Sequence, residues 1–170
     1  ADLRYADLSN ASLASSNLIK ANLESANLSF VDLRDTNLKG ANFESSKLNA
    51  SILSGMDLRE INFFNTDFTN ARLEQTNFSG ENLNKSIFLN SNLSSSNLSY
   101  SSLQNTVFKG ANLVEANLSN SDLLGANLEN ADLSKANLFG ANLKGAVLYN
   151  VVFCHTTMPD GSVKSSSCEN

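Results

Sequence analysis

The residues of this chain that could carry metal or thiol chemistry lie close to its C-terminal end. Cys154 and Cys168 are the only cysteines, and the single histidine, His155, directly follows the first of them. A cysteine beside a histidine can form a nucleophilic pair or contribute to a zinc site. The sequence has no four-ligand zinc spacing, so we interpret His155 as a solvated residue of a terminal cap. We therefore predict no metal site and no cofactor.

The rest of the sequence contains no catalytic motif. A phosphate-binding glycine loop and a nucleophile elbow are both missing. Carboxylates recur at one position of a short repeat, and the repetition explains them without catalysis: Asp7, Asp32, Asp57, Asp67, Asp122 and Asp132. We predict that the protein is not an enzyme and has no catalytic residues.

The repeat is five residues long and accounts for most of the composition. The 170 residues include 26 Leu, 26 Asn, 26 Ser and 16 Ala. From Leu3 to Phe153 every fifth residue is Leu or Phe, which gives 31 central positions, 24 Leu and 7 Phe. The residue two before each centre is small, with three bulkier exceptions, and the residue directly before it is usually Asn or Asp. The exceptions are Met56, Ile61 and Glu81.

A period of five residues fits neither regular secondary structure. On an α-helix, five residues advance by about 500°, so the leucines would scatter around the whole surface. In a flat strand the period is two, so they would alternate between faces. The chain must therefore turn a corner once per unit, which makes a solenoid. Gly or Asn stands two residues after the centre in 15 of the 31 units, as expected for the positive φ of a type II turn.

The units ADLSN (6–10), ANLES (21–25) and ANLKG (141–145) resemble those of the pentapeptide-repeat family. The resemblance implies an all-β fold, a right-handed quadrilateral β-helix with 20 residues per coil and about eight coils. We expect this β-helix over residues 1–155 and a short C-terminal capping segment over 156–170. A 20-residue coil would stack Phe68, Phe88 and Phe108 as a ladder in the core.

The capping segment contains the two cysteines. The repeat ends after Phe153, Pro159-Asp160-Gly161 indicates a tight turn, and Cys154 and Cys168 flank a loop of 13 residues. We favour a Cys154–Cys168 disulfide over two free thiols, which would indicate an oxidising compartment. The tail is similar to those of cyanobacterial pentapeptide-repeat proteins, some of which are exported. This likeness favours the periplasm or the thylakoid lumen, with the cytoplasm as the alternative.

The N-terminal end of the solenoid has no cap in this sequence. Leu3, Leu8, Leu13 and Leu18 would form an apolar end layer. Either residues were removed upstream, or this end stacks on something, such as a second copy of the chain. We therefore consider end-to-end self-association through this coil.

Composition and charge limit the partners. The net charge is −5, with 12 cations and 17 anions, which argues against nucleic-acid binding. No apolar run is long enough for membrane insertion. We predict a rigid scaffold that binds an unknown protein partner. The alternative, which rests on the family resemblance, is a DNA mimic that binds the type II topoisomerase gyrase.

Residues that depart from the repeat are the candidates for a binding surface. Apolar side chains replace polar ones at outward positions and are expected to form a strip across two faces: Phe64, Ile87, Leu89, Val107 and Leu124. Such a strip can mark a partner site. The alternative is that β-branched residues are simply tolerated on a β-ladder. Glu81 is either a corner residue that turns outward or part of a specific site.

Overall fold

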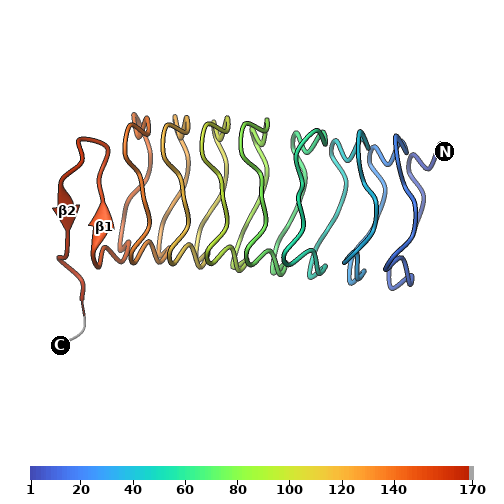
Figure 1. Ribbon diagram of the computed structural model, residues 1–170, viewed down its shortest axis with the longest axis horizontal. Helices are drawn as coiled ribbons and strands as arrows, with labels where there is room; N and C mark the ends of the chain where they lie inside the picture. Colours follow the sequence, from blue (N-terminus) through green and yellow to red (C-terminus); the bar gives the residue numbers. More distant parts are fainter. Residues whose placement is uncertain (169–170) are drawn as a thin grey trace.

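The computed structural model describes residues 1–168 and has the form of a rod of stacked coils (Figure 1). Parallel bridges pair the residue before each central Leu or Phe with the residue 20 positions later, as in Asn22 with Asn42 and Ile87 with Val107. Twenty residues correspond to four units, so each coil has four sides. The predicted all-β fold, a right-handed quadrilateral β-helix, is confirmed.

Each corner of a coil is formed by a residue in the left-handed region. Every fifth residue from Tyr5 to His155 has a positive φ, from 52° at Lys20 to 77° at Gly55. The next N–H closes the corner, as when Ala6 donates to the carbonyl of Leu3 over 3.2 Å. This is the pattern of a type II turn. Corners without Gly or Asn adopt it as well, because the ladders on both sides hold the backbone in place.

The central residues and the small residues before them fill the interior. Leu23 to Leu138 are almost fully buried at every fifth position. Phe68, Phe88 and Phe108 lie in one column with their rings nearly parallel, at centroid distances of 4.9 and 5.0 Å. Burying a Leu or Phe side chain stabilises the fold by about 1.5–3 kcal/mol. The interior is therefore committed to packing, and any binding surface must use the outward residues.

A two-stranded antiparallel sheet follows the last full coil. Strand β1 (Thr156–Thr157) pairs with β2 (Val163–Lys164). Thr157 also bridges Asn137 one coil earlier, and the carbonyl of Pro159 accepts the N–H of Gly140. The ladder therefore continues past residue 155, where we had expected the β-helix to end. Within residues 1–168, no helix is long and apolar enough to cross a membrane.

Candidate interaction surfaces and the C-terminal clasp

The ladder of bridges is interrupted at one corner of the rod. In the part of the chain that the structure describes, the ladder lacks two pairs that its period requires, Asn37–Asp57 and Asn62–Asn82. The three bulky residues at otherwise small inward positions lie in the coils around these gaps: Met56, Ile61 and Glu81. Each side of a coil points two side chains into the core, the central Leu or Phe and the small residue before it. A bulkier residue at the small position prevents neighbouring coils from approaching closely. The departures in the sequence thus explain where the ladder opens.

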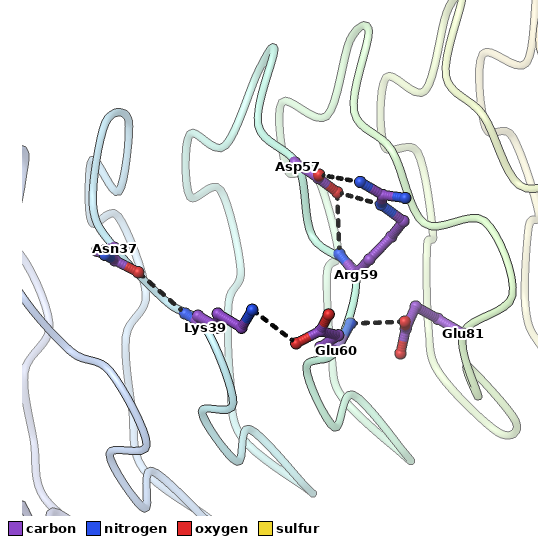
Figure 2. A network of polar contacts seen from close by, with 6 residues as sticks. All are labelled: Asn37, Lys39, Asp57, Arg59, Glu60 and Glu81. Atoms are coloured by element: carbon purple, nitrogen blue, oxygen red, sulfur yellow. Dashed lines mark hydrogen bonds and ion pairs between the residues drawn. The ribbon is translucent and has the colours of Figure 1, made fainter.

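A charged network surrounds this opening, which we call the polar gap (residues 36–39, 57, 59 and 60; Figure 2). The gap is a hollow of about 380 Å³. The Arg59 guanidinium binds both carboxylate oxygens of Asp57, at 2.9 and 2.7 Å. Lys39 Nζ lies 3.3 Å from the Glu60 carboxylate. Each charge of the gap thus has an opposite charge beside it.

Glu81 contributes to the gap from the next coil. One oxygen of its carboxylate accepts the backbone N–H of Glu60 over 2.7 Å. Partial burial of this carboxylate raises its pKa, and the negative charges of Glu60 and Asp57 add to the effect. The hydrogen bond with Arg59 lowers the pKa of Asp57. Glu81 therefore reaches across to a neighbouring coil, whereas we had considered only an outward turn or an unspecified site.

The same Asp–Arg pairing occurs in three places that share the sequence Asp-Leu-Arg. In each, the arginine is two residues after the aspartate and binds its carboxylate, at 2.8 Å for Arg4–Asp2 and 2.6 Å for Arg34–Asp32. These pairs and the polar gap were not predicted from the sequence. The signals were present, in the Asp-Leu-Arg triplets and in the clustering of Met56, Ile61 and Glu81.

The five residues of the predicted apolar strip lie on two adjacent faces of the rod. Ile87 and Val107 bridge each other on one face, and Leu89 lies beside them; all three are half-buried. Phe64 and Leu124 lie on the adjacent face three coils apart. Leu124 is 37% exposed, whereas Phe64 is half-buried below the Lys85 ammonium, 5.5 Å from its ring centroid. We define the apolar patch as Ile87, Leu89 and Val107.

Other large apolar side chains are exposed singly along the rod. At corner positions, three side chains are 65–72% exposed: Tyr5, Phe30 and Tyr100. These corner residues were not identified from the sequence, although a large side chain two residues after the centre was a visible departure. Phe139, Val147 and Tyr149 are exposed close to the C-terminal end.

The C-terminal clasp (residues 154–168) closes the end of the rod. Cys154 and Cys168 form a disulfide, with their Cα atoms 4.7 Å apart. The turn is fixed by Asp160, whose carboxylate accepts the N–H of Ser162 at 2.9 Å, and by Gly161, which has a φ of 84°. The Ser165 hydroxyl lies 3.3 Å from Nδ1 of His155. The only histidine is therefore held beside the disulfide.

Comparisons with known families agree with this geometry. A family described as pentapeptide repeats (8 copies) matches residues 1–40, 26–63 and 41–80. A second family, described as a pentapeptide repeat region, matches residues 61–138. Together these matches cover residues 1–138. No curated protein matches the chain.

Several solved structures are similar. QnrB1, a plasmid-mediated fluoroquinolone resistance protein, is 21% identical over 86% of this chain and 77% of its own, with a TM-score of 0.56. HetL, involved in heterocyst differentiation regulation in the cyanobacterium Nostoc sp., is 26% identical over 96% and 91%, with a TM-score of 0.33. A thylakoid-lumen pentapeptide repeat protein of Arabidopsis thaliana is 23% identical over 72% and 68%, with a TM-score of 0.36. The similarity to QnrB1 is one of fold.

Proposed function

The chain belongs to the pentapeptide-repeat family, and from this premise we propose that it is a non-catalytic, rigid scaffold that binds another protein through the apolar patch. The observation that carries the proposal is the position of Ile87, Leu89 and Val107, which lie together on one flat face of the rod. Their surroundings on that face are polar. A small apolar area on a rigid polar surface can dock a partner without loss of backbone entropy.

A matched set of variants tests the patch. Ile87→Thr with Val107→Thr keeps the β-branched shape and removes apolar surface from the patch. Ile52→Thr makes the same change at the same position of the unit on another face, where Ile52 bridges Asp32 and Arg72. We expect the wild type and Ile52→Thr to capture the same protein from native extract, and the double variant to lose it. Equal capture by all three, or capture by none, contradicts the proposal.

The alternative function, a DNA mimic that binds gyrase, has less support. Mimicry requires an extended negative surface, and here the arginines at positions 4, 34 and 59 each neutralise an aspartate on the same coil. Lys109 and Lys135 pair with Glu129 and Glu115 on neighbouring coils. An effect of the purified protein on gyrase supercoiling would favour the alternative over the scaffold.

We also propose an oxidising compartment, the periplasm or the thylakoid lumen, as the place where the scaffold works. The support is the disulfide, since such bonds persist mainly where thiols are not kept reduced. Alkylation of native cell extract with a mass-tagged maleimide tests this. We expect no label on Cys154 and Cys168 before reduction, and labelling of both would indicate the cytoplasm instead.

A further inference from the structure

The C-terminal clasp brings together two cysteines and a histidine, which are side chains that zinc ions bind. The sulfurs of Cys154 and Cys168 and a ring nitrogen of His155 all lie within 4.8 Å of one another. In tetrahedral zinc sites the metal lies about 2.3 Å from sulfur and 2.0–2.1 Å from nitrogen, which places the ligand atoms roughly 3.5 Å apart. The disulfide holds the two sulfurs closer than this. Opening the bond allows them to reach that separation with small side-chain movements.

We infer that reduction of the Cys154–Cys168 disulfide converts the clasp into a Zn²⁺ site, with two thiolates and the His155 imidazole as ligands. The site goes beyond the proposed scaffold function and does not depend on it, because the apolar patch lies elsewhere on the rod. Two thiolates and one imidazole suit Zn²⁺, and a water molecule completes the tetrahedron.

Contacts other than the disulfide also hold His155 in place. The residue has a φ of 54° as the last corner of the rod, and its backbone N–H donates to Ser165 Oγ at 3.3 Å. The same oxygen lies 3.3 Å from Nδ1 of the ring. A hydroxyl beside a ligating imidazole orients the ring, as partners of metal-bound histidines commonly do. Ser165 is therefore a positioning residue for this site.

Contacts other than the disulfide keep Cys168 close to Cys154. The N–H of Ser167 donates to the carbonyl of Phe153 at 3.2 Å. The Lys164 ammonium lies 3.9 Å above the Phe153 ring, and β1 pairs with β2. These contacts span the segment between the two cysteines. A reduced clasp thus retains part of the geometry that zinc requires, which lowers the entropic cost of binding.

Cys154 and Cys168 are half-buried and line a hollow at the clasp. This hollow of about 360 Å³ is lined by Asp132, Ser134, Val152, Cys154, Ser167 and Cys168. It offers a route for a reductant and for the metal, and it provides the water for the fourth position. The Asp132 carboxylate already accepts the N–H of Ser134 at 2.9 Å and its hydroxyl at 2.6 Å, so we assign it no place among the ligands.

A dithiol can supply the two electrons that reduce the Cys154–Cys168 disulfide. One thiolate of the reductant attacks a cystine sulfur and forms a mixed disulfide, and its second thiol then releases the protein sulfur. The reductant loses two electrons and becomes a disulfide, while Cys154 and Cys168 gain two electrons and two protons. Binding of Zn²⁺ by the two thiolates releases those two protons. Zinc affinity of the reduced protein should therefore rise with pH.

The experiment measures Zn²⁺ binding to the full chain by competition with a chromophoric chelator. A phosphine is used as reductant, because small dithiols themselves bind zinc. We expect the reduced protein to bind one Zn²⁺ per chain and the oxidised protein to bind none. His155→Ala should weaken binding by at least about tenfold, and Ser165→Ala by a smaller factor. Cys168→Ser should bring binding down to the oxidised level.

A second measurement reports on structure. Lys164 is exposed, so trypsin cuts after it when the clasp is loose. We expect Zn²⁺ to slow this cleavage in the reduced wild type and to have no effect in reduced His155→Ala. The inference is overturned if reduced and oxidised protein bind zinc equally, if His155→Ala binds like the wild type, or if zinc leaves cleavage unchanged.

Discussion

The carboxylate of Glu81 replaces a backbone carbonyl as the acceptor for the N–H of Glu60, at 2.7 Å. At most other corners of the rod the corresponding N–H donates to the carbonyl 19 residues later, as when Lys20 donates to Lys39 at 2.9 Å. A side chain thus takes over a ladder contact at a position where the ladder is open. The exchange places a carboxylate next to two others, on Glu60 and Asp57.

Glu81→Gln should stabilise the protein at neutral pH. The amide oxygen can still accept the N–H of Glu60, and the charge that opposes Glu60 and Asp57 is removed. Because the side chain is half-exposed, we expect a gain on the order of 0.5 kcal/mol. Burial raises the pKa of Glu81 in the folded state, so the ionised form destabilises the fold. Urea denaturation at several pH values measures the effect.

The stability difference between Glu81→Gln and the wild type should depend on pH. The advantage of the glutamine variant is complete above the folded-state pKa of Glu81. It decreases as pH falls through that pKa and is gone below the unfolded value of about 4.3, where both states are protonated. An advantage that persists unchanged at pH 3, or a loss of stability at pH 7, contradicts this account.

Asp122→Asn should show the opposite dependence. Hydrogen bonds from Gln104, from the backbone of Leu124 and from Asn142 lower the pKa of Asp122. The carboxylate therefore stabilises the fold above its unfolded pKa of about 3.9, and this contribution is lost as pH falls through the folded-state pKa. We expect the variant to be less stable than the wild type at pH 7 and equal to it in strong acid. Urea denaturation at several pH values tests both Glu81→Gln and Asp122→Asn.

Phe88→Ala should be among the most damaging single substitutions. Phe88 is fully buried between Phe68 and Phe108, and its removal leaves a cavity that the coils above and below cannot fill. We expect a loss of about 3–5 kcal/mol. Phe88→Leu is the matched control, because Leu is the usual central residue, and should cost less than about 1.5 kcal/mol. Similar losses for both variants in denaturant melts would show that the stacked column is unimportant.

Substitutions at two glycine corners should distinguish the cost of backbone strain from the cost of a steric clash. Both Gly55 and Gly110 have positive φ, so Ala at either position costs about 1 kcal/mol. A Cβ at Gly110 would overlap Oδ1 of Asn90 on the previous coil, whereas one at Gly55 meets nothing within 4 Å. We therefore expect a larger drop in Tm for Gly110→Ala than for Gly55→Ala. Gly110→Ala combined with Asn90→Ala should remove the difference.

Cys168→Ser should loosen the clasp and leave the coils intact. The disulfide joins residues 14 positions apart, and closing a loop of about 15 residues is worth roughly 3 kcal/mol. We expect faster amide exchange over residues 156–167, with exchange at central residues such as Leu93 unchanged. Faster exchange along the whole rod would show that the clasp protects more than its own end.

Much of the fold could be predicted from the sequence. The five-residue spacing of Leu and Phe excludes helix and flat strand, so the coil follows from the pattern, and Phe68, Phe88 and Phe108 lie in one column. Binding surfaces were harder to predict. Phe64 and Leu124 lie three coils from each other on the face adjacent to the apolar patch, as their residue numbers imply, and a common binding surface of all five residues stays a prediction.

The sequence by itself determined the architecture, because every unit repeats the same local choice: an apolar centre, a small neighbour and a corner. It also determined the only possible disulfide, since there are two cysteines. Only the tertiary structure decided that Glu81 meets Glu60 and that His155 lies beside both sulfurs. Contacts between residues about 20 positions apart form only when a coil has closed, and their geometry depends on how side chains cross from one coil to the next.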